Sequence, residues 1–344
     1  MKDAGHVEGD GPDPGVKPGS KSGATGSTGS GRYGAVRYRW VDVVTMAYMA
    51  ATGTLWLLIG HQRPGWLVAV LLHFGYVAFG LEMVRASQRR PSSRLLLELR
   101  TWYPAFIIVY CFFDVTRLQA LLSSDTFWAT DALVRADLAI FGVHPTVWIL
   151  RWHRPWLDEL ICFFNVSYYL IPFVYAVTMV LTRRRPEVWA GASLALFTYV
   201  VNYVLFLLLP AIGPRMVPEI EALRVTTLHG HGPFVWLLHL VQGDHGAVRG
   251  AAFPSAHVSA SVVWAMAAWR YERRIAWLLW ILSLGTAFST IYLGFHHAID
   301  PVAGLLLGTV TYLVGLRILR ARGEDPVIDP VSAARESVAR AARV

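Results

Sequence analysis

Two short segments of the sequence combine residue types that can act on a phosphoryl group. In Phe253-Pro-Ser-Ala-His257 a serine and a histidine lie two residues apart, after a proline and before an apolar run. Further along, His296 and Asp300 are four residues apart, a spacing that puts both on one face of a helix or across a tight turn. An aspartate that accepts from one imidazole nitrogen fixes the tautomer and leaves the other nitrogen free to attack. The spacing therefore predicts an oriented histidine that can act as a base or as a nucleophile.

The first of these segments has the features of an anion site. Pro254 suits the first position of a helix, because its fixed φ fits there and its missing N–H would be unpaired in any case. Ser255, Ala256 and His257 then form the first turn, where free N–H groups and the helix dipole favour a phosphate. Ala256 is small enough for close approach, Ser255 adds a donor and His257 adds an acid. The alternative is that Ser255 only completes the helix start and His257 lies at the membrane interface.

Other polar residues near these segments have two interpretations each. Arg215 follows Gly213 and Pro214, and arginine can hold phosphate oxygens in a bidentate way, although arginines at span ends also face lipid headgroups. Asp300 precedes a proline, so it also fits a helix N-cap. His297 and Tyr292 are predicted to be interfacial anchors.

The elements that position these residues are predicted to be membrane-spanning helices. Charged residues make up 16% of the chain, against about 25% in soluble domains, and apolar stretches of about 20 residues recur. The fold class expected is an all-α integral membrane protein, a multi-span helical bundle with interfacial helices. We expect about eight spans, at residues 40–60, 66–84, 101–121, 156–181, 188–210, 254–270, 274–294 and 299–319.

The positive charge follows the membrane topology and does not indicate a nucleic-acid partner. The net charge is +8, but 23 of the 31 Lys and Arg residues fall in alternate inter-span segments, which the positive-inside rule places in the cytoplasm. Both termini are then cytoplasmic, and the three polar segments share the outer face of the cell membrane. Four regions are expected: a disordered cytoplasmic tail (1–36), N-terminal spans (37–122), a catalytic membrane domain (123–321) and a cytoplasmic tail (322–344).

The ordered set resembles a known superfamily. An arginine at one span end, Pro-Ser-x-His at the next span start and Ser-x6-His-x3-Asp after it resemble the three-part signature of the type 2 phosphatidic acid phosphatase (PAP2) superfamily. The segments FPSAH and YLGFHHAIDPVAG are similar to those of its inositol phosphorylceramide synthase (Aur1-like) branch. The likeness is strongest over 205–310, weaker over 125–205 and absent from the first 120 residues.

This resemblance implies a six-helix core and a role for each matched residue. His296 would form a phosphohistidine, Asp300 would orient it and His257 would protonate the leaving oxygen. Arg215, Ser255 and Ala256 would bind the phosphoryl oxygens. No metal and no cofactor is implied, and the substrate would be a phospholipid or lipid phosphate.

The sequence departs from the superfamily pattern at several positions. Leu208 stands where the superfamily has a lysine and Thr290 where it has an arginine, so two cationic phosphate contacts are missing. Arg249, Arg224 or the intramembrane Arg117, paired with Asp114 one helical turn earlier, are candidates to replace them. Met216 and Ala256 are further departures, at a proline and a glycine of that pattern.

Several functions stay open on the sequence. The phosphoryl acceptor is either water, which makes the protein a phosphatase, or an alcohol such as inositol, which makes it a transferase. A metal-binding or transport protein using His257, His296, His297 and Asp300 is one rival interpretation. A scaffold without activity is the other. The oligomeric state is not predicted.

Overall fold

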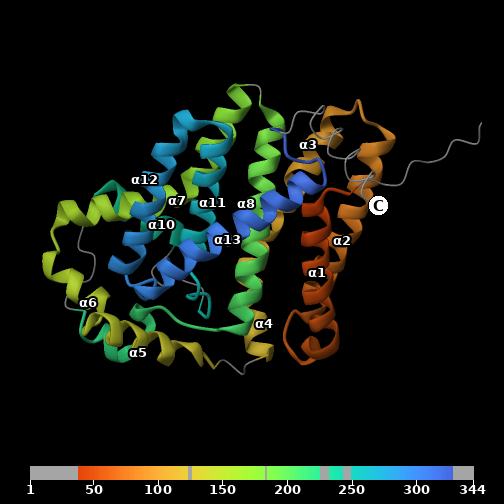
Figure 1. Cartoon of the computed structure of the whole chain (residues 1–344). Coiled ribbons are helices and arrows are strands. Elements are labelled where there is room, and N and C mark those ends of the chain that lie inside the picture. The colour runs from red at the N-terminus through yellow and green to blue at the C-terminus, as the bar shows by residue number, and fades with distance from the viewer. Residues whose placement is uncertain (1–37, 123–125, 183, 225–231, 243–248, 328–344) are drawn as a thin grey trace, which may run out of the picture. The chain divides into compact units, whose positions relative to one another are not determined.

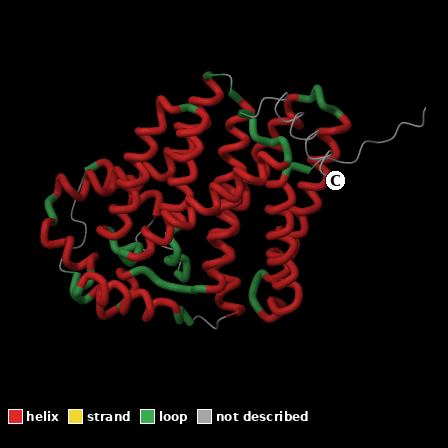
Figure 2. Tube along the Cα trace, viewed as in Figure 1, coloured by secondary structure: helices red, strands yellow, loops and turns green. Residues whose placement is uncertain are grey.

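The computed structural model describes residues 38–122, 126–182, 184–224, 232–242 and 249–327. The tail expected over 1–36 and most of the one expected over 322–344 lie outside the described residues. In the described part of the chain all regular structure is helical, apart from one parallel bridge between Ala211 and Ala251 (Figure 2). The all-α prediction is confirmed.

The N-terminal spans form one group of helices. They are α1 (Trp40–Ile59), η1 (Gly60–Gln62), α2 (Trp66–Arg89), α3 (Arg94–Trp102), η2 (Tyr103–Ala105) and α4 (Phe106–Leu122). α8 (Arg185–Leu208) packs against α1 and α4 on one side and against α11 (Ala256–Tyr271) on the other (Figure 1). This central helix therefore joins the N-terminal spans to the rest of the bundle.

The remaining long helices build the main apolar core. α11 packs on α7 (Pro155–Leu181), α8, α12 (Arg273–Tyr292) and α13 (Ile299–Ala321), and α7 and α13 also pack on α8. Close packing of α13 on α11 depends on Gly304, because a side chain there would lie 2.7 Å from the carbonyl oxygen of Ser255. A side chain at Gly308 would meet the Ser259 backbone in the same way. These contacts hold the start of α13 beside the start of α11, where the two chemical segments lie.

Short helices connect the long ones. They are α5 (Ala129–Phe141), α6 (Pro145–Ile149), η3 (Leu150–Trp152), η4 (Pro214–Met216), α9 (Pro218–Glu221) and α10 (Pro233–Gln242). Of these, α5 and α6 lie across the bottom of the bundle in Figure 1, and α10 packs against α7. The sequence predicted 122–155 as a connecting segment outside the spans, but α5 and the α6–η3 pair are apolar helices that meet at a bend of 58°. Ala129 and Leu133 of α5 are buried in a small apolar cluster, while Ile140 and Trp152 are exposed.

Within the described residues seven helices are long and apolar enough to cross a membrane, or eight if the bent pair counts as one span. This supports a multi-pass membrane protein, with a span number close to the eight expected. The spans are not all those that were predicted, because the helix at the predicted span 254–270 is α11, which has only 16 residues and falls short of a full span. About 20 residues are needed to cross the hydrocarbon core.

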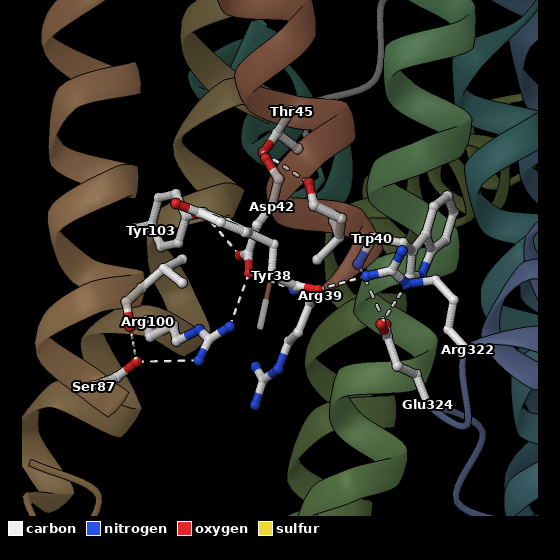
Figure 3. Close-up of polar contacts among 12 residues, drawn as sticks. Tyr38, Arg39, Trp40, Asp42, Thr45, Ser87, Arg100, Tyr103, Arg322 and Glu324 are labelled. Carbon is white, nitrogen blue, oxygen red and sulfur yellow. Dashed lines mark hydrogen bonds and ion pairs between the residues drawn. The ribbon is translucent and has the colours of Figure 1, made fainter. Parts of the chain in front are cut away.

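Buried polar contacts tie α1 to α3 and to the residues after α13 (Figure 3). The Asp42 carboxylate accepts hydrogen bonds from Arg100 at 3.1 Å and from the Tyr103 hydroxyl at 2.8 Å. Nearby, the backbone N–H of Trp40 donates to Glu324. The ends of α1, α2, α3 and α13 are thereby gathered at the bundle end opposite the chemical segments.

Candidate active site

His296 lies in the short turn between α12 and α13, with its ring fixed by a backbone carbonyl. Its Nδ1 is 2.7 Å from the carbonyl oxygen of Ala252 and 3.4 Å from Oδ2 of Asp300. A carbonyl oxygen can only accept, so Nδ1 carries the proton and Nε2 keeps a free lone pair. The residue expected to orient His296 was Asp300, but the shorter bond is to Ala252.

The electrostatic surroundings keep His296 neutral. Burial lowers its pKa to about 3, the Ala252 bond partly opposes this, and the nearby His297 and Arg215 lower it further. At neutral pH the imidazole is therefore unprotonated at Nε2, which is the form that a nucleophile requires.

His257 faces His296 from the first turn of α11. The two ring centroids are 5.8 Å apart and the rings are nearly perpendicular. On its other side the His257 ring lies 4.5 Å from that of Tyr168 on α7, whose hydroxyl bonds to Tyr199 at 2.5 Å. In the sequence, the only indication of this aromatic contact is that the span 163–175 is rich in tyrosine.

The start of α11 differs by two residues from the sequence prediction. Pro254 precedes the helix, and Ser255 is its N-cap, with Oγ accepting the Val258 N–H at 3.4 Å. Ala256, which is buried, is the first helical residue. Because the Ser255 oxygen accepts the capping bond, its hydroxyl proton stays available for a donor bond to a phosphoryl oxygen.

Asp300 is also shifted from its predicted place. It is the second residue of α13 and not its N-cap, which is Ala298. The Asp300 side chain is fully buried, and Oδ2 accepts the His297 N–H at 2.9 Å. Its backbone carbonyl accepts the Ser255 N–H at 3.3 Å, so the two chemical segments are bonded to each other.

Arg215 is held against the turn that carries His296. Its N–H donates to the Gly294 carbonyl at 3.1 Å, and its guanidinium carbon lies 4.0 Å from the centre of the Phe295 ring. Gly213 makes this approach fit, since a side chain there would overlap the Phe295 carbonyl. The loop after α8 thus brings a guanidinium next to the histidine pair.

Arg224 is the second guanidinium at this turn. It sits against Gly294, whose φ of +71° and contact with Arg224 leave no room for a side chain. Arg224 donates to the Thr146 hydroxyl at 3.1 Å and pairs with Glu221 at 3.4 Å. Burial lowers the pKa of Arg215 to about 10 and the charge of Arg224 adds to this, so the two cations are close and both stay protonated at neutral pH.

The other candidate cations lie elsewhere. Arg249 is exposed, with its guanidinium carbon 5.3 Å from the Phe127 ring centre. Arg117 and Asp114 do pair, at 3.8 Å, but Arg117 also stacks on Trp56 near the α1–α2 connection. The described contacts of these residues do not reach His257 or His296.

His297 is a buried residue of this site and not the interfacial anchor that was predicted. Its side chain is 1% exposed, with Nε2 3.2 Å from the Ile212 carbonyl and Nδ1 3.7 Å from Oδ2 of Asp137. Burial acts to lower the pKa of His297, but the bond to Asp137 and the charges of Asp300 and Asp137 outweigh it, so the pKa is raised. Both ring nitrogens face acceptors, which favours an imidazolium.

Asp137 on α5 links this imidazolium to the start of α13. Its two carboxylate oxygens accept the backbone N–H groups of Ala298 at 2.9 Å and Ile299 at 3.2 Å. The first N–H groups of a helix have no acceptor within the helix, and a carboxylate is a good acceptor for them. Asp137 was missed because its segment was interpreted as a connection, although the apolar spacing of residues 129–141 could have predicted the helix.

We expect Asp137→Asn to destabilise the protein by about 2–4 kcal/mol, since it removes a carboxylate cap and the counter-charge of a buried imidazolium. His297 has a raised pKa, so its pairing with Asp137 contributes below the unfolded value near 6.5 and is lost as pH rises through the folded pKa. The difference in melting temperature from wild type should therefore shrink as pH rises from 6 to 10. Asp131→Asn, at an exposed position of the same helix, should have little effect at any pH. An equal loss at all pH values would contradict the charged pair.

Among the described residues no group of three or more His, Cys, Asp and Glu side chains is arranged to hold a metal ion. The side chains gathered here are three imidazoles, of His257, His296 and His297, with the carboxylates of Asp137 and Asp300, the Ser255 hydroxyl and two guanidinium groups.

These features define a helical membrane protein in which imidazole and guanidinium groups gather around the turn between α12 and α13. A family model described as the PAP2 superfamily matches residues 131–314, from within α5 to within α13. The match covers more than half of the chain, and the chain belongs to the PAP2 superfamily. This membership supports a phosphatase or phosphotransferase. No curated protein and no solved structure matches the chain significantly.

Proposed function

We propose that this protein transfers a phosphoryl group from a phospholipid or lipid phosphate through a phosphohistidine on His296. The observation that carries the proposal is the imidazole pair: His296 has Nε2 freed by its Nδ1 bond to Ala252, and His257 lies 5.8 Å away, ring centre to ring centre. Arg215 and Arg224 flank the same turn and supply charge for phosphoryl oxygens.

In the first half-reaction Nε2 of His296 attacks phosphorus in line. The new N–P bond forms as the P–O bond to the leaving group breaks, and His257 gives its proton to the departing oxygen. Burial and the nearby His296 lower the pKa of His257 to about 3, so His257 is neutral before substrate binds. The charge of a phosphate bound beside it is what favours its protonated form. The arginines and the Ser255 hydroxyl stabilise the three other oxygens of the transferring group.

In the second half-reaction an acceptor hydroxyl attacks the phosphohistidine. His257, now neutral, takes the hydroxyl proton and His296 leaves with the electron pair of the N–P bond. Water yields phosphate or a phosphomonoester, and an alcohol such as inositol or a lipid hydroxyl yields a new phosphoester. We propose the Aur1-like branch, since the wording FPSAH and YLGFHHAIDPVAG and the absence of cations at Leu208 and Thr290 favour it.

Arg224 is proposed to replace one missing cationic phosphate contact. We expect Arg224→Ala to lower kcat/KM by about 10–100-fold, the effect of losing a charge-assisted hydrogen bond. Arg224→Lys should recover only part of this, because a single ammonium cannot make a bidentate contact. Steady-state rates with a lipid phosphate measure both effects.

Arg249→Ala and Arg117→Ala are the matched controls, because each removes one arginine that lies away from the imidazole pair. Both should keep kcat/KM within a few-fold of wild type. A large loss for Arg249→Ala with none for Arg224→Ala would reverse the assignment.

A product assay on the purified full chain in detergent tests the function itself. It offers phosphatidylinositol and a panel of lipid phosphates, with and without inositol or diacylglycerol as acceptor, beside His296→Ala. Free phosphate defines a hydrolase, and a new phospholipid without free phosphate defines a transferase. No product from any substrate would favour a scaffold that keeps the fold.

We further propose that both termini are cytoplasmic and that the site faces the outside of the cell membrane. The support is the excess of Lys and Arg in alternate inter-span segments. Labelling of single cysteines by an impermeant reagent tests this: a cysteine at exposed Arg249 should react in intact cells, and one at Arg274 should react only after lysis.

A further inference from the structure

A basic cavity lies at the bundle end opposite the imidazole pair. Its volume is about 430 Å³, and it is lined by the connection between α7 and α8 and by the turn between α11 and α12. Since α11 begins beside His257 and ends at Tyr271, its length of about 24 Å separates the two places. In Figure 1 this turn is at the top of the bundle. The cavity is therefore independent of the proposed active site.

The wall of this cavity carries an excess of positive charge. Arg184, Arg270, Arg273 and Arg274 line it, together with a single acidic residue, Glu272. Glu272 is shared, at 3.5 Å from Arg184 and 3.9 Å from Arg274. One carboxylate cannot neutralise two guanidinium groups, so the pair leaves a net positive charge in the wall.

The other two arginines differ in how they are held. Arg270 is fixed by Asp325, at 2.6 Å, which the segment after α13 brings to the cavity edge. Arg273 is the first residue of α12 and is exposed. The start of α12 adds backbone N–H groups and the positive end of a helix dipole to the same wall. The cavity thus combines fixed and adaptable cations, which suits a bound anion.

An apolar surface continues from this cavity along the bundle. Trp269 and Trp277 stack edge to face with ring centres 4.9 Å apart, and both are exposed. Below Trp277, the outward face of α12 continues with Ile281 and Leu284, each 57% exposed. Exposed tryptophans next to a basic rim are typical of the membrane interface, and basic pockets between helices bind lipid headgroups there.

We infer that this cavity binds the phosphate headgroup of an anionic phospholipid, whose acyl chains lie along the exposed face of α12. A free phosphate would use the same arginines but not the tryptophan pair or the apolar face. A lipid headgroup and a free phosphate can therefore be distinguished, because only the lipid also contacts the tryptophan pair and the apolar face.

The test is calorimetric titration of the purified full chain in a neutral detergent. Three probes separate the sources: dihexanoyl-phosphatidylglycerol, glycerol phosphate and zwitterionic dihexanoyl-phosphatidylcholine. All proteins carry Arg215→Ala and Arg224→Ala, which removes the arginines proposed for the active site. If the proposed function is wrong, these changes simply leave binding unaltered, and the comparison at the cavity still holds.

We expect saturable binding of the phosphatidylglycerol, about ten-fold weaker or more after Arg273→Ala with Arg274→Ala. Both side chains are exposed, so the fold should tolerate their loss, and Arg273→Lys with Arg274→Lys should retain most of the affinity. The matched control is Arg89→Ala with Arg90→Ala, which removes two exposed arginines at the end of α2, on the same side of the bundle, and should leave binding unchanged.

Three outcomes would overturn the inference. Glycerol phosphate binding as tightly as the lipid would show a site for soluble phosphate. Equal binding of the zwitterionic lipid would show that the arginines do not select the ligand. Equal losses in the cavity variant and the control would show only a general attraction between charges.

Discussion

A His296→Ala variant is expected to lose nearly all turnover, by roughly 10⁴–10⁶-fold, as is usual when a covalent nucleophile is removed. The physical reason is that Nε2 of His296 is a neutral, buried lone pair, held by the Ala252 carbonyl. In this variant the His257 imidazole could not replace the missing nucleophile, because it cannot reach the position of the His296 ring unless α11 moves. Turnover of a lipid phosphate by the purified variant measures the loss.

The control for this variant is His239→Ala, which removes an exposed histidine on α10 and should keep wild-type turnover. A second measurement follows the intermediate itself: a radiolabelled substrate should leave an acid-labile phosphate on the wild-type protein and none on His296→Ala. Near wild-type turnover after the His296 change would mean that the nucleophile lies elsewhere.

The loss in a His257→Ala variant is expected to be smaller, about 10²–10⁴-fold, and to depend on the leaving group. A general acid matters most when the leaving oxygen is a strong base, such as the alkoxide of a lipid. With p-nitrophenyl phosphate, whose phenolate leaves without a proton, His257→Ala should approach the wild-type rate of phosphohistidine formation. Rapid-quench measurement of that step for both substrates tests the prediction.

His257→Gln is a useful companion, because it retains bulk beside Tyr168 but cannot donate as an acid of similar strength. It should behave like the alanine variant. An equal loss for the lipid and for the nitrophenyl substrate would instead indicate that His257 binds the phosphoryl group and does not protonate the leaving oxygen.

Much of the fold was predictable because the membrane imposes strong rules on sequence. Long apolar runs gave the places of α1, α2, α7, α8, α12 and α13 to within a few residues. The helices α5 and α6 were missed because residues 122–155 were interpreted as a connection between spans. The apolar spacing of residues 129–141 does predict a helix, but it does not predict where that helix lies on the bundle.

The site was predictable where chemistry depends on side-chain type. Arg215, His257 and His296 come together from three separate segments, as their spacing and resemblance suggested. The partner of His296 was not predictable, since a backbone carbonyl has no sequence signature. Asp137 was missed for a related reason: it acts across more than 150 residues of chain, on two backbone N–H groups.

Side chains of α4 contact the residues just before α11. The side-chain amide of Gln119 on α4 donates to the carbonyl of Gly250 and to that of Phe206, each at 2.7 Å. Gly250 lies two residues before Ala252, whose carbonyl holds the His296 ring, and a side chain at Gly250 would overlap Gln119.

The two hydrogen bonds of Gln119 limit which N-terminal segments can be removed from this chain or exchanged. The family match begins at residue 131, yet the loop that sets the tautomer of His296 is anchored from residue 119. A chain beginning at residue 123 would therefore keep every proposed site residue but lose one of the anchors of this loop, leaving its bonds to Ala211.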